Sequence, residues 1–277
     1  MSAAGPAGAA TSDGAADREI SFIAALDYET RPAAEVRDSL LGAGYDSVEW
    51  TMAHLDELLA PASALACQQD LASGGESAVA ITIEAIAKAA AAGIGTVNVL
   101  TGPNLWEPGH RAAHDETAWK VVLNGLELIC AAGEREGVKV GLEPCWGNLA
   151  HSAETAQRVF EAVPVSVTFD PSHFVMTGDP IPELVERWGE RIVHFHLKDA
   201  FGREGIDGED FIFCLLGEGD VPWPETFAAL DRVGYDGPMS VEFEAYRYYE
   251  QVLGSDPDAA AVLAMEQVRA LTGREAR

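Results

Sequence analysis

The feature of this sequence that most constrains its fold is a regular alternation between short apolar runs and longer segments with helical periodicity. Eight runs have the apolar character of buried strands, and segments with apolar residues at helical spacing separate nearly all of them. Repeated strand–helix units favour parallel strands, because a parallel connection needs a long crossover, which is usually a helix. The predicted strands are residues 20–26, 45–50, 95–100, 138–143, 165–170, 191–197, 211–216 and 238–244.

Eight such units in a chain of 277 residues fit an α/β fold of the (β/α)8 TIM-barrel type, which typically needs about 250 residues. A doubly wound open sheet is the alternative, but no GxGxxG motif follows the first predicted strand, so a dinucleotide site is not supported. We predict one catalytic domain over residues 18–277 and a disordered tail over residues 1–17. The excursion after residue 50 predicts two helices, near 54–60 and 78–92.

The charge and the cysteine pattern restrict the partners and the compartment. The chain has 45 acidic and 18 basic residues, a formal net charge of −27, and such a field repels nucleic acid and anionic membrane surfaces. No apolar run is long enough to span a bilayer. The four cysteines form no CxxC pair, which is typical of free thiols in a reducing compartment. We therefore predict a cytoplasmic protein without nucleic-acid or membrane partners.

Carboxylates and imidazoles gather where several predicted strands end. In a barrel of parallel strands, the active site lies at the carboxyl ends of the strands. One such stretch, residues 194–199, reads HFHLKD and carries two histidines at a spacing of two. The side chains concerned are Glu143, Asp170 with His173 just beyond it, His194, His196, Glu242 and Glu244.

The strand pattern leaves two choices open within this set. Side chains two positions apart share a face of a strand, so spacing does not decide between His194 and His196, or between Glu242 and Glu244. Carboxylates with one imidazole suit Mn²⁺, Mg²⁺, Co²⁺ or Zn²⁺, with open positions for water or substrate oxygens. Cysteine is absent from the set, which argues against a closed structural zinc site.

Four segments resemble successive motifs of the sugar phosphate isomerase/epimerase superfamily, whose members have a xylose-isomerase-like TIM barrel and include endonuclease IV. The resemblance extends from about residue 18 to residue 272, nearly the whole chain. Endonuclease IV-like members carry an Asp-x-His pair between the sixth strand and the glycine-rich turn that follows it. The corresponding stretch here has no histidine, so the multi-zinc nuclease site is incomplete. The motifs are VGLEPCWGNL, VTFDPSHF, IVHFHLKDA and LGEGDVPWPETFAALDRVGYDGPMSVEFE.

The resemblance implies one divalent metal ion, most often Mn²⁺ in such proteins, and it resolves both open choices in favour of His196 and Glu242. The implied metal ligands are Glu143, Asp170, His196 and Glu242, and the implied catalytic groups are Glu143 and Glu242. The implied activity is that of a sugar isomerase or epimerase, which moves a proton through a metal-stabilised enediolate of a keto sugar or polyol. Loss of a hydroxyl instead would make a dehydratase or lyase, of the inosose-dehydrating or C-glycoside-cleaving kind, with the same ligand set.

Other side chains are predicted to meet the substrate. Aromatic faces pack on sugar rings, and polar tips bond hydroxyls. Few lysines and arginines lie near the predicted site, and a phosphate usually recruits several of them, so an unphosphorylated sugar or polyol is expected. The predicted substrate-binding residues are His173, Trp106, Trp146, Lys198, Arg203 and Glu49.

Each of these residues also has an ordinary structural interpretation. His194 can be a hydrogen-bonded core residue that supports the site, and Lys198 can form an ion pair with Asp199 or with the strand-end carboxylates. A third class of function is a metal-free barrel that binds a sugar or serves as one subunit of a larger enzyme. A homo-oligomer is expected from the resemblance alone.

Overall fold

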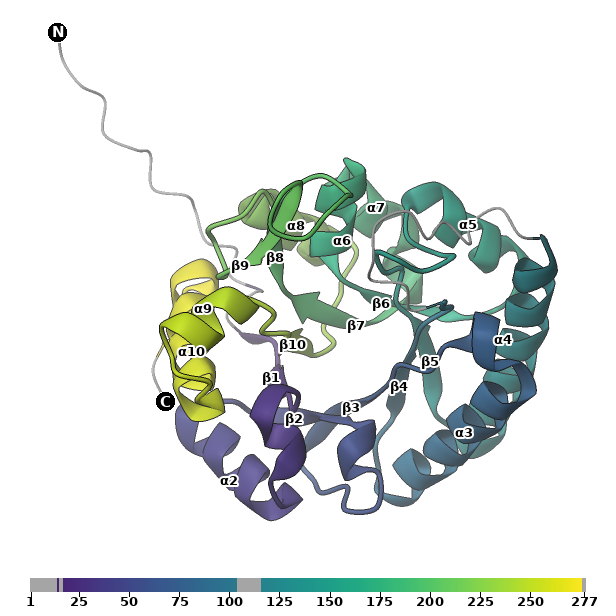
Figure 1. Cartoon of the computed structure of the whole chain (residues 1–277), viewed down its shortest axis with the longest axis horizontal. Helices are drawn as coiled ribbons and strands as arrows, with labels where there is room; N and C mark the ends of the chain where they lie inside the picture. The colour runs from purple at the N-terminus through teal and green to yellow at the C-terminus, as the bar shows by residue number, and fades with distance from the viewer. Residues whose placement is uncertain (1–13, 15–16, 104–115, 276–277) are drawn as a thin grey trace, which may run out of the picture.

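The alternating pattern folds into a closed barrel of eight parallel strands with helices around its outside (Figure 1). The computed structural model describes residue 14 and residues 17–103 and 116–275. Neighbouring strands follow the order β1-β10-β7-β6-β5-β4-β3-β2, and β2 pairs with β1 to close the ring. The predicted single-domain (β/α)8 barrel is confirmed. Most of the predicted tail lies outside the described residues, so its disorder stays a prediction.

The barrel strands are β1 (Ile20–Ile23), β2 (Ser47–Thr51), β3 (Ala62–Cys67), β4 (Thr96–Val99), β5 (Lys139–Leu142), β6 (Ser166–Phe169), β7 (Ile192–Leu197) and β10 (Met239–Val241). A separate antiparallel pair consists of β8 (Asp199–Gly202) and β9 (Phe211–Cys214). The α-helices are α2 (Ala33–Ala43), α3 (Leu71–Ala91), α4 (Glu116–Glu136), α5 (Ala153–Ala162), α6 (Pro171–Thr177), α7 (Ile181–Trp188), α8 (Trp223–Arg232), α9 (Tyr246–Gln251) and α10 (Pro257–Thr272). Short 3₁₀ helices are η1 (Leu26–Thr30), η2 (Met52–His54) and η4 (Gly189–Arg191).

Local sequence signals set the ends of several helices. Helix α2 begins after Pro32 and ends at Gly44, whose φ of 105° lies in the left-handed region that glycine adopts without steric cost. Helix α5 begins at a capping box, in which the Ser152 and Thr155 side chains each accept the other residue's backbone N–H. The caps satisfy backbone groups that the first and last helical turns leave unpaired.

One predicted barrel strand lies outside the barrel and one barrel strand was missed, although the total of eight barrel strands is right. Strand β3 (Ala62–Cys67) lies in the excursion for which only helices were predicted, and it pairs with β2 and β4. Its sequence, ASALAC, is rich in alanine, a residue that favours helices when tertiary pairing does not intervene. The run 211–216 was assigned to the barrel, but β9 pairs with β8 outside the ring.

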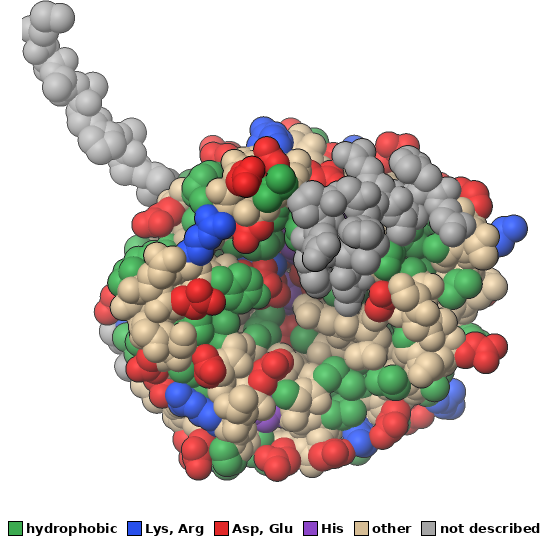
Figure 2. Space-filling view, viewed as in Figure 1, with side chains coloured by type: hydrophobic (Ala, Val, Ile, Leu, Met, Phe, Trp, Pro, Cys, Tyr) green, Lys and Arg blue, Asp and Glu red, His purple; other side chains and the backbone are tan. Residues whose placement is uncertain are grey.

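The carboxyl ends of the strands open onto one face of the molecule. Figure 2 shows a hollow at the centre of this face, with acidic and histidine side chains inside it. The outward-facing side chains of the barrel strands pack against the surrounding helices in one continuous apolar core. Among the described residues, none of the helices combines the length and apolar character that a bilayer crossing requires.

Candidate metal centre

Four potential ligand atoms converge at the bottom of the hollow. Glu143 follows β5, Asp170 follows β6, His196 lies in β7, and Glu242 follows β10. One ligand atom of each of these residues lies within 4.8 Å of the corresponding atom of every other. The first three side chains are almost completely buried, and the Glu242 side chain is 10% exposed. The structure thus brings together all four ligands implied by the resemblance.

Hydrogen bonds orient two of the carboxylates toward this cluster. Asn98 on β4 donates from Nδ2 to Oε2 of Glu143 at 2.9 Å, which leaves Oε1 facing His196. The backbone N–H and the hydroxyl of Ser172 both donate to Oδ1 of Asp170, at 2.8 and 2.7 Å. Asp170 is therefore the N-cap of α6, and its buried Oδ2 faces Nζ of Lys198 at 3.0 Å. One oxygen of each carboxylate remains available for a cation.

His196 lies between the cluster and a buried carboxylate beneath it. Its Nδ1 lies 3.2 Å from Oε1 of Glu143 and 3.2 Å from Oε2 of Glu242. Its Nε2 lies 3.4 Å from Oε2 of Glu49 on β2, and the same oxygen is 2.8 Å from Nε2 of His194. A carboxylate behind a ligating imidazole fixes which ring nitrogen carries the proton. The arrangement turns Nε2 of His196 toward Glu49 and Nδ1 toward the cluster, where Nδ1–H donates to Oε1 of Glu143.

The charges of this buried network perturb its ionisable groups. Burial by itself would raise the pKa of Glu49, but His194 and His196 outweigh it and hold that pKa below its usual value. Burial would likewise lower the pKa of His196, but the carboxylates of Glu143, Glu49 and Glu242 together raise it well above the ordinary value. In the absence of a metal ion, protonated His196 offsets part of the negative charge around it.

Lys198 supplies the one ammonium group that lies among the cluster carboxylates in the described part of the chain. Its Nζ lies 3.0 Å from Oδ2 of Asp170, 2.8 Å from Oε2 of Glu242 and 2.8 Å from Oε2 of Glu244. Together with Glu143 the group has four carboxylates, against one ammonium and the protonated imidazole of His196, so its formal charge is −2. A buried excess of that size is costly unless a cation joins it. The donor set of three carboxylates and an imidazole fits a divalent metal ion.

His173 on α6 borders the same cluster as a neutral ring. Burial lowers the pKa of His173 to about 4, although nearby Asp170 acts in the opposite direction. The backbone N–H of Trp146 donates to its Nδ1 at 3.4 Å, so the proton of the neutral ring is on Nε2. That N–H points toward Oδ2 of Asp170 at 3.4 Å. His173 is thus a hydrogen-bond donor at the edge of the cluster.

A cavity of about 440 Å³ opens above the cluster. Glu143, His173, Lys198, Glu242 and Glu244 form its polar floor, and three aromatic side chains form one wall. We call it the proximal cavity. Its remaining lining residues are Gln68, Cys145, Trp146, Asp207, Phe211, Phe213 and Tyr246.

The other predicted substrate-binding residues differ in where the structure places them. Trp146 lines the proximal cavity, whereas Trp106 lies outside the described residues. Arg203 is exposed and donates to the backbone carbonyls of Val175 and Gly202, away from this cavity. Glu49 is completely buried beneath His196 and lines neither this cavity nor the one beside it. The geometry therefore favours a positioning role for Glu49, and the predicted sugar contacts of these residues stay predictions.

Asp199 has a structural role that answers one question left by the sequence. Its carboxylate accepts hydrogen bonds from the backbone N–H groups of Gly217, Gly219 and Val221 and from the indole of Trp223. It therefore holds the turn that leads into α8 rather than pairing with Lys198. Burial raises the pKa of Asp199, against the lowering effect of these donors.

Two further residues complete the site. Asn98, which sequence reasoning missed, holds Glu143, and Glu244, which the strand pattern left as an alternative to Glu242, forms an ion pair with Lys198. Asn98 left a detectable signal, since it is a lone amide within the apolar run GTVNVL. A buried amide needs hydrogen-bond partners, so such a residue at a strand end merits attention.

Comparison with known proteins gives the family. The model of the xylose isomerase-like TIM barrel matches residues 58–271. The chain therefore belongs to that family, and the resemblance inferred from the motifs is confirmed. The match covers the ligand cluster and the strands β3 to β10.

Individual relatives are more distant. An inosose dehydratase of Clostridium perfringens is 26% identical over 145 residues, which are 47% of this chain and 48% of that protein. The matched part of this chain spans about half the length of the curated relatives. Among solved structures, an IolI protein with a bound zinc atom has a TM-score of 0.72 at 17% identity and covers 92% of this chain and 98% of that one. A D-allulose 3-epimerase from Methylomonas sp. has a TM-score of 0.65 at 17% identity, with coverages of 92% and 98%.

Proposed function

We propose that this protein is a divalent-metal-dependent isomerase or epimerase that transfers a proton on a keto sugar or polyol. The observation that carries the proposal is the cluster of three carboxylates and one imidazole, of which Glu143 and Glu242 line a cavity together with aromatic side chains. Ligand sets of this kind leave coordination positions open to substrate oxygens.

The metal ion would be held by Glu143, Asp170, His196 and Glu242. When bound, such an ion stabilises the negative charge that develops on substrate oxygens next to a carbonyl. The excess of negative charge in the cluster supports a cation at this place. Mn²⁺ is the ion we propose, with Mg²⁺, Co²⁺ and Zn²⁺ as the alternatives for the metal analysis.

Glu143 and Glu242 are the proposed proton-transfer groups. One carboxylate takes the proton from the carbon next to the carbonyl, and a proton returned to the opposite face of that carbon completes epimerisation. Return of a proton to the neighbouring carbon converts an aldose into a ketose instead. Lys198 and the Nε2–H of His173 line the same cavity and are placed to donate hydrogen bonds to sugar hydroxyls.

The charge of the cavity bears on the class of substrate. Lys198 is the one basic side chain among the residues that line the proximal cavity, and it is already paired with three carboxylates. A phosphate or carboxylate on the substrate would therefore meet net negative charge, even beside a divalent ion. We propose an uncharged sugar or cyclitol as the substrate.

Dehydration of a cyclitol or sugar is the second candidate. It is favoured by the sequence match to an inosose dehydratase, 26% identical over 145 residues. This reaction shares the first proton abstraction but continues with loss of a hydroxyl as water. The same ligand set serves both outcomes, so the assay must separate them.

The test is solvent-deuterium exchange with metal-loaded protein. Purified protein is analysed for bound divalent metal, loaded with Mn²⁺, and incubated in D₂O with ketoses and inososes. Deuterium at the carbon next to the carbonyl, without loss of water, supports isomerisation or epimerisation. Loss of water from an inosose supports the second candidate. Protein that binds neither Mn²⁺ nor any other divalent ion would refute both and leave a metal-free sugar-binding barrel or subunit.

A further inference from the structure

A second cavity adjoins the proximal one across the mouth of the barrel. It measures about 220 Å³ and shares Gln68, Glu242, Glu244 and Tyr246 with its neighbour. We call it the distal cavity. Its other lining residues belong mainly to the ends of β1, β2 and β3 and to η1, and they are Phe22, Ile23, Ala25, Leu26, Glu29, Thr51, Met52, Ala66, Gln69 and Phe243.

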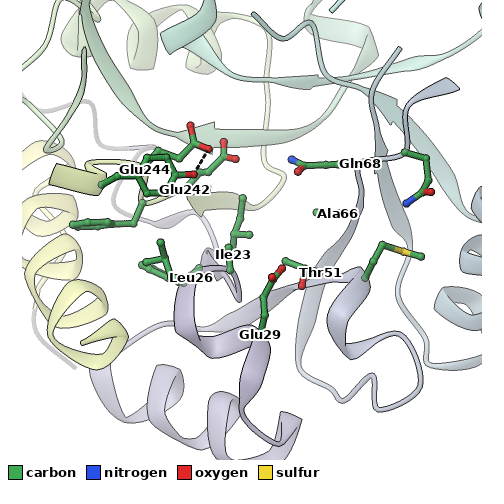
Figure 3. A pocket seen from close by; sticks show the side chains of 14 residues that line it. Ile23, Leu26, Glu29, Thr51, Ala66, Gln68, Glu242 and Glu244 are labelled. Carbon is green, nitrogen blue, oxygen red and sulfur yellow. Dashed lines mark hydrogen bonds between the residues drawn. The ribbon is translucent and has the colours of Figure 1, made fainter. Parts of the chain in front are cut away.

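The distal cavity lies away from the reacting centre. Glu143, His173 and Lys198 line the proximal cavity but not the distal one, and Glu242 lies at the boundary. Figure 3 shows Glu242 and Glu244 on one side of the distal cavity, with Thr51 and other residues of β2 and β3 across from them. A ring that reacts at the metal ligands must occupy the proximal cavity, so the distal cavity remains for another part of the same molecule.

Thr51 gives the distal cavity an unused polar group. Its side chain is only 9% exposed, and its Oγ1 has no hydrogen-bond partner among the described residues. Buried hydroxyls without partners are uncommon, because they forgo bonds that water would offer. Thr51 lines the cavity at the end of β2, with its Oγ1 just beneath the cavity surface, so a rotation of the side chain would let a ligand hydroxyl complete its hydrogen bonding.

The remaining lining restricts the chemistry of the occupant. Ile23, Leu26 and Met52 offer apolar surface, and Glu29 and Gln69 offer polar groups beside it. Such mixed lining suits a ring with apolar faces and hydroxylated edges. No lysine or arginine is among the described residues that line this cavity. An anionic group would therefore meet only negative charge.

We infer that the distal cavity is a subsite for a second, uncharged hydroxylated ring, so that the substrate is a glycoside rather than a free monosaccharide. This inference rests on the proposed function, because it assumes that the reacting ring lies over the ligand cluster. The second ring stacks on the apolar residues of β1 and η1, and one of its hydroxyls bonds Thr51. The link between the two rings passes Glu242 and Gln68 at the boundary of the cavities.

Calorimetric binding to Mn²⁺-loaded protein tests the subsite without requiring turnover. The probes are polyols that lack a carbonyl, each compared with a glycosylated form: D-glucitol with maltitol and isomaltitol, and myo-inositol with galactinol. We expect at least one glycosylated form to bind about tenfold more tightly than its parent polyol. Thr51→Val should lower that gain by about threefold to tenfold, the effect of one hydrogen bond, and leave the affinity of the parent unchanged.

Two further variants make the result specific. Ala66→Leu fills the distal cavity and should abolish the gain while the parent polyol still binds. Thr96→Val, a matched change at a buried threonine near the opposite end of the barrel, should leave both affinities unchanged.

The inference is overturned if no glycosylated form binds more tightly than its parent, or if the gain survives in both cavity variants. In that case metal binding and deuterium exchange would remain, so the proposed function would stand. Failure of the metal-loaded protein to bind any parent polyol would overturn the proposed function as well.

Discussion

Replacement of Lys198 by methionine tests whether charge balance holds the candidate metal centre together. The change keeps an unbranched side chain of similar length and removes the ammonium group. That group is nearly completely buried and contacts Asp170, Glu242 and Glu244 at 3.0, 2.8 and 2.8 Å. Burial lowers the pKa of Lys198, but these carboxylates outweigh burial and raise it well above the usual value.

The size of the effect follows from the proton that the variant must bind. Without the ammonium, the folded protein relieves the repulsion by protonating one carboxylate. Protonating a carboxyl group whose ordinary pKa is about 4 costs about 1.4 kcal/mol for each pH unit above that pKa. The protonation therefore costs about 4 kcal/mol of stability at pH 7 and about 1.4 kcal/mol at pH 5. Both values are upper limits, because solvent screening and structural relaxation reduce the repulsion between the carboxylates.

The sign of the pH dependence follows from the carboxyl group that the variant must protonate. In the unaltered protein, burial would raise the pKa of Asp170, but Lys198 and the neighbouring histidines hold it below the usual value, and the resulting stabilisation is the same at pH 7 and pH 5, which both lie above the unfolded-state pKa. In the variant, the protonated carboxyl has a raised folded-state pKa, and the cost of protonating it falls with the pH. The difference in stability from the unaltered protein therefore shrinks from pH 7 to pH 5.

Urea unfolding in the presence of EDTA, at both pH values, measures this difference. Addition of Mn²⁺ at pH 7 should reduce the stability difference between the variant and the unaltered protein, because the ion supplies positive charge in place of the ammonium. Lys88→Met is the matched control, since Lys88 pairs with Asp56 and Glu84 at the surface, and it should cause no measurable change. A stability difference that is equal at pH 7 and pH 5 and insensitive to Mn²⁺ would refute the charge-balance explanation.

Three further predictions concern the ligands and their support. Glu143→Gln should retain the circular dichroism spectrum but lower deuterium exchange by at least about 100-fold, and unchanged exchange would exclude the proton-transfer role. Glu49→Gln should weaken Mn²⁺ binding by about 10- to 100-fold in chelator competition, and unaltered affinity would contradict the positioning role. Because carboxylates raise the pKa of His196 well above its ordinary value, Mn²⁺ must displace a proton there, so affinity should keep rising with pH above the ordinary histidine pKa of about 6.5, with proton release; a flat profile would count against it.

The periodicity of apolar residues predicted most of the fold, because it shows which side of each segment packs against its neighbours. Apolar strands and amphipathic helices are readable in sequence, since the two patterns differ in period. Strand β3 escaped because ASALAC has small residues without β-branching, and its strand state depends on pairing with β2 and β4. Strand β9 looked like a barrel strand because local composition does not specify a pairing partner.

The sequence by itself determined that carboxylates and imidazoles end several strands, and with the family resemblance it selected Glu143, Asp170, His196 and Glu242. Only the tertiary structure decided which atom of each side chain faces the cluster. Hydrogen bonds and contacts from Asn98, Ser172 and Glu49 fix the orientation of the ligands. Asn98 and Glu49 act on residues distant from them in the chain, and Ser172 acts on Asp170 across one turn.

The stretch HFHLKD illustrates the same division. Alternation along the strand predicted that its two histidines share a face, but the partners of each came from other strands. His194 contacts Glu49, His196 also faces the ligand cluster, Lys198 lies among three carboxylates, and Asp199 holds a distant turn. Sequence specifies the chemistry and the face of each side chain. Closure of the barrel decides which groups meet, because it brings strands far apart in the chain to one mouth.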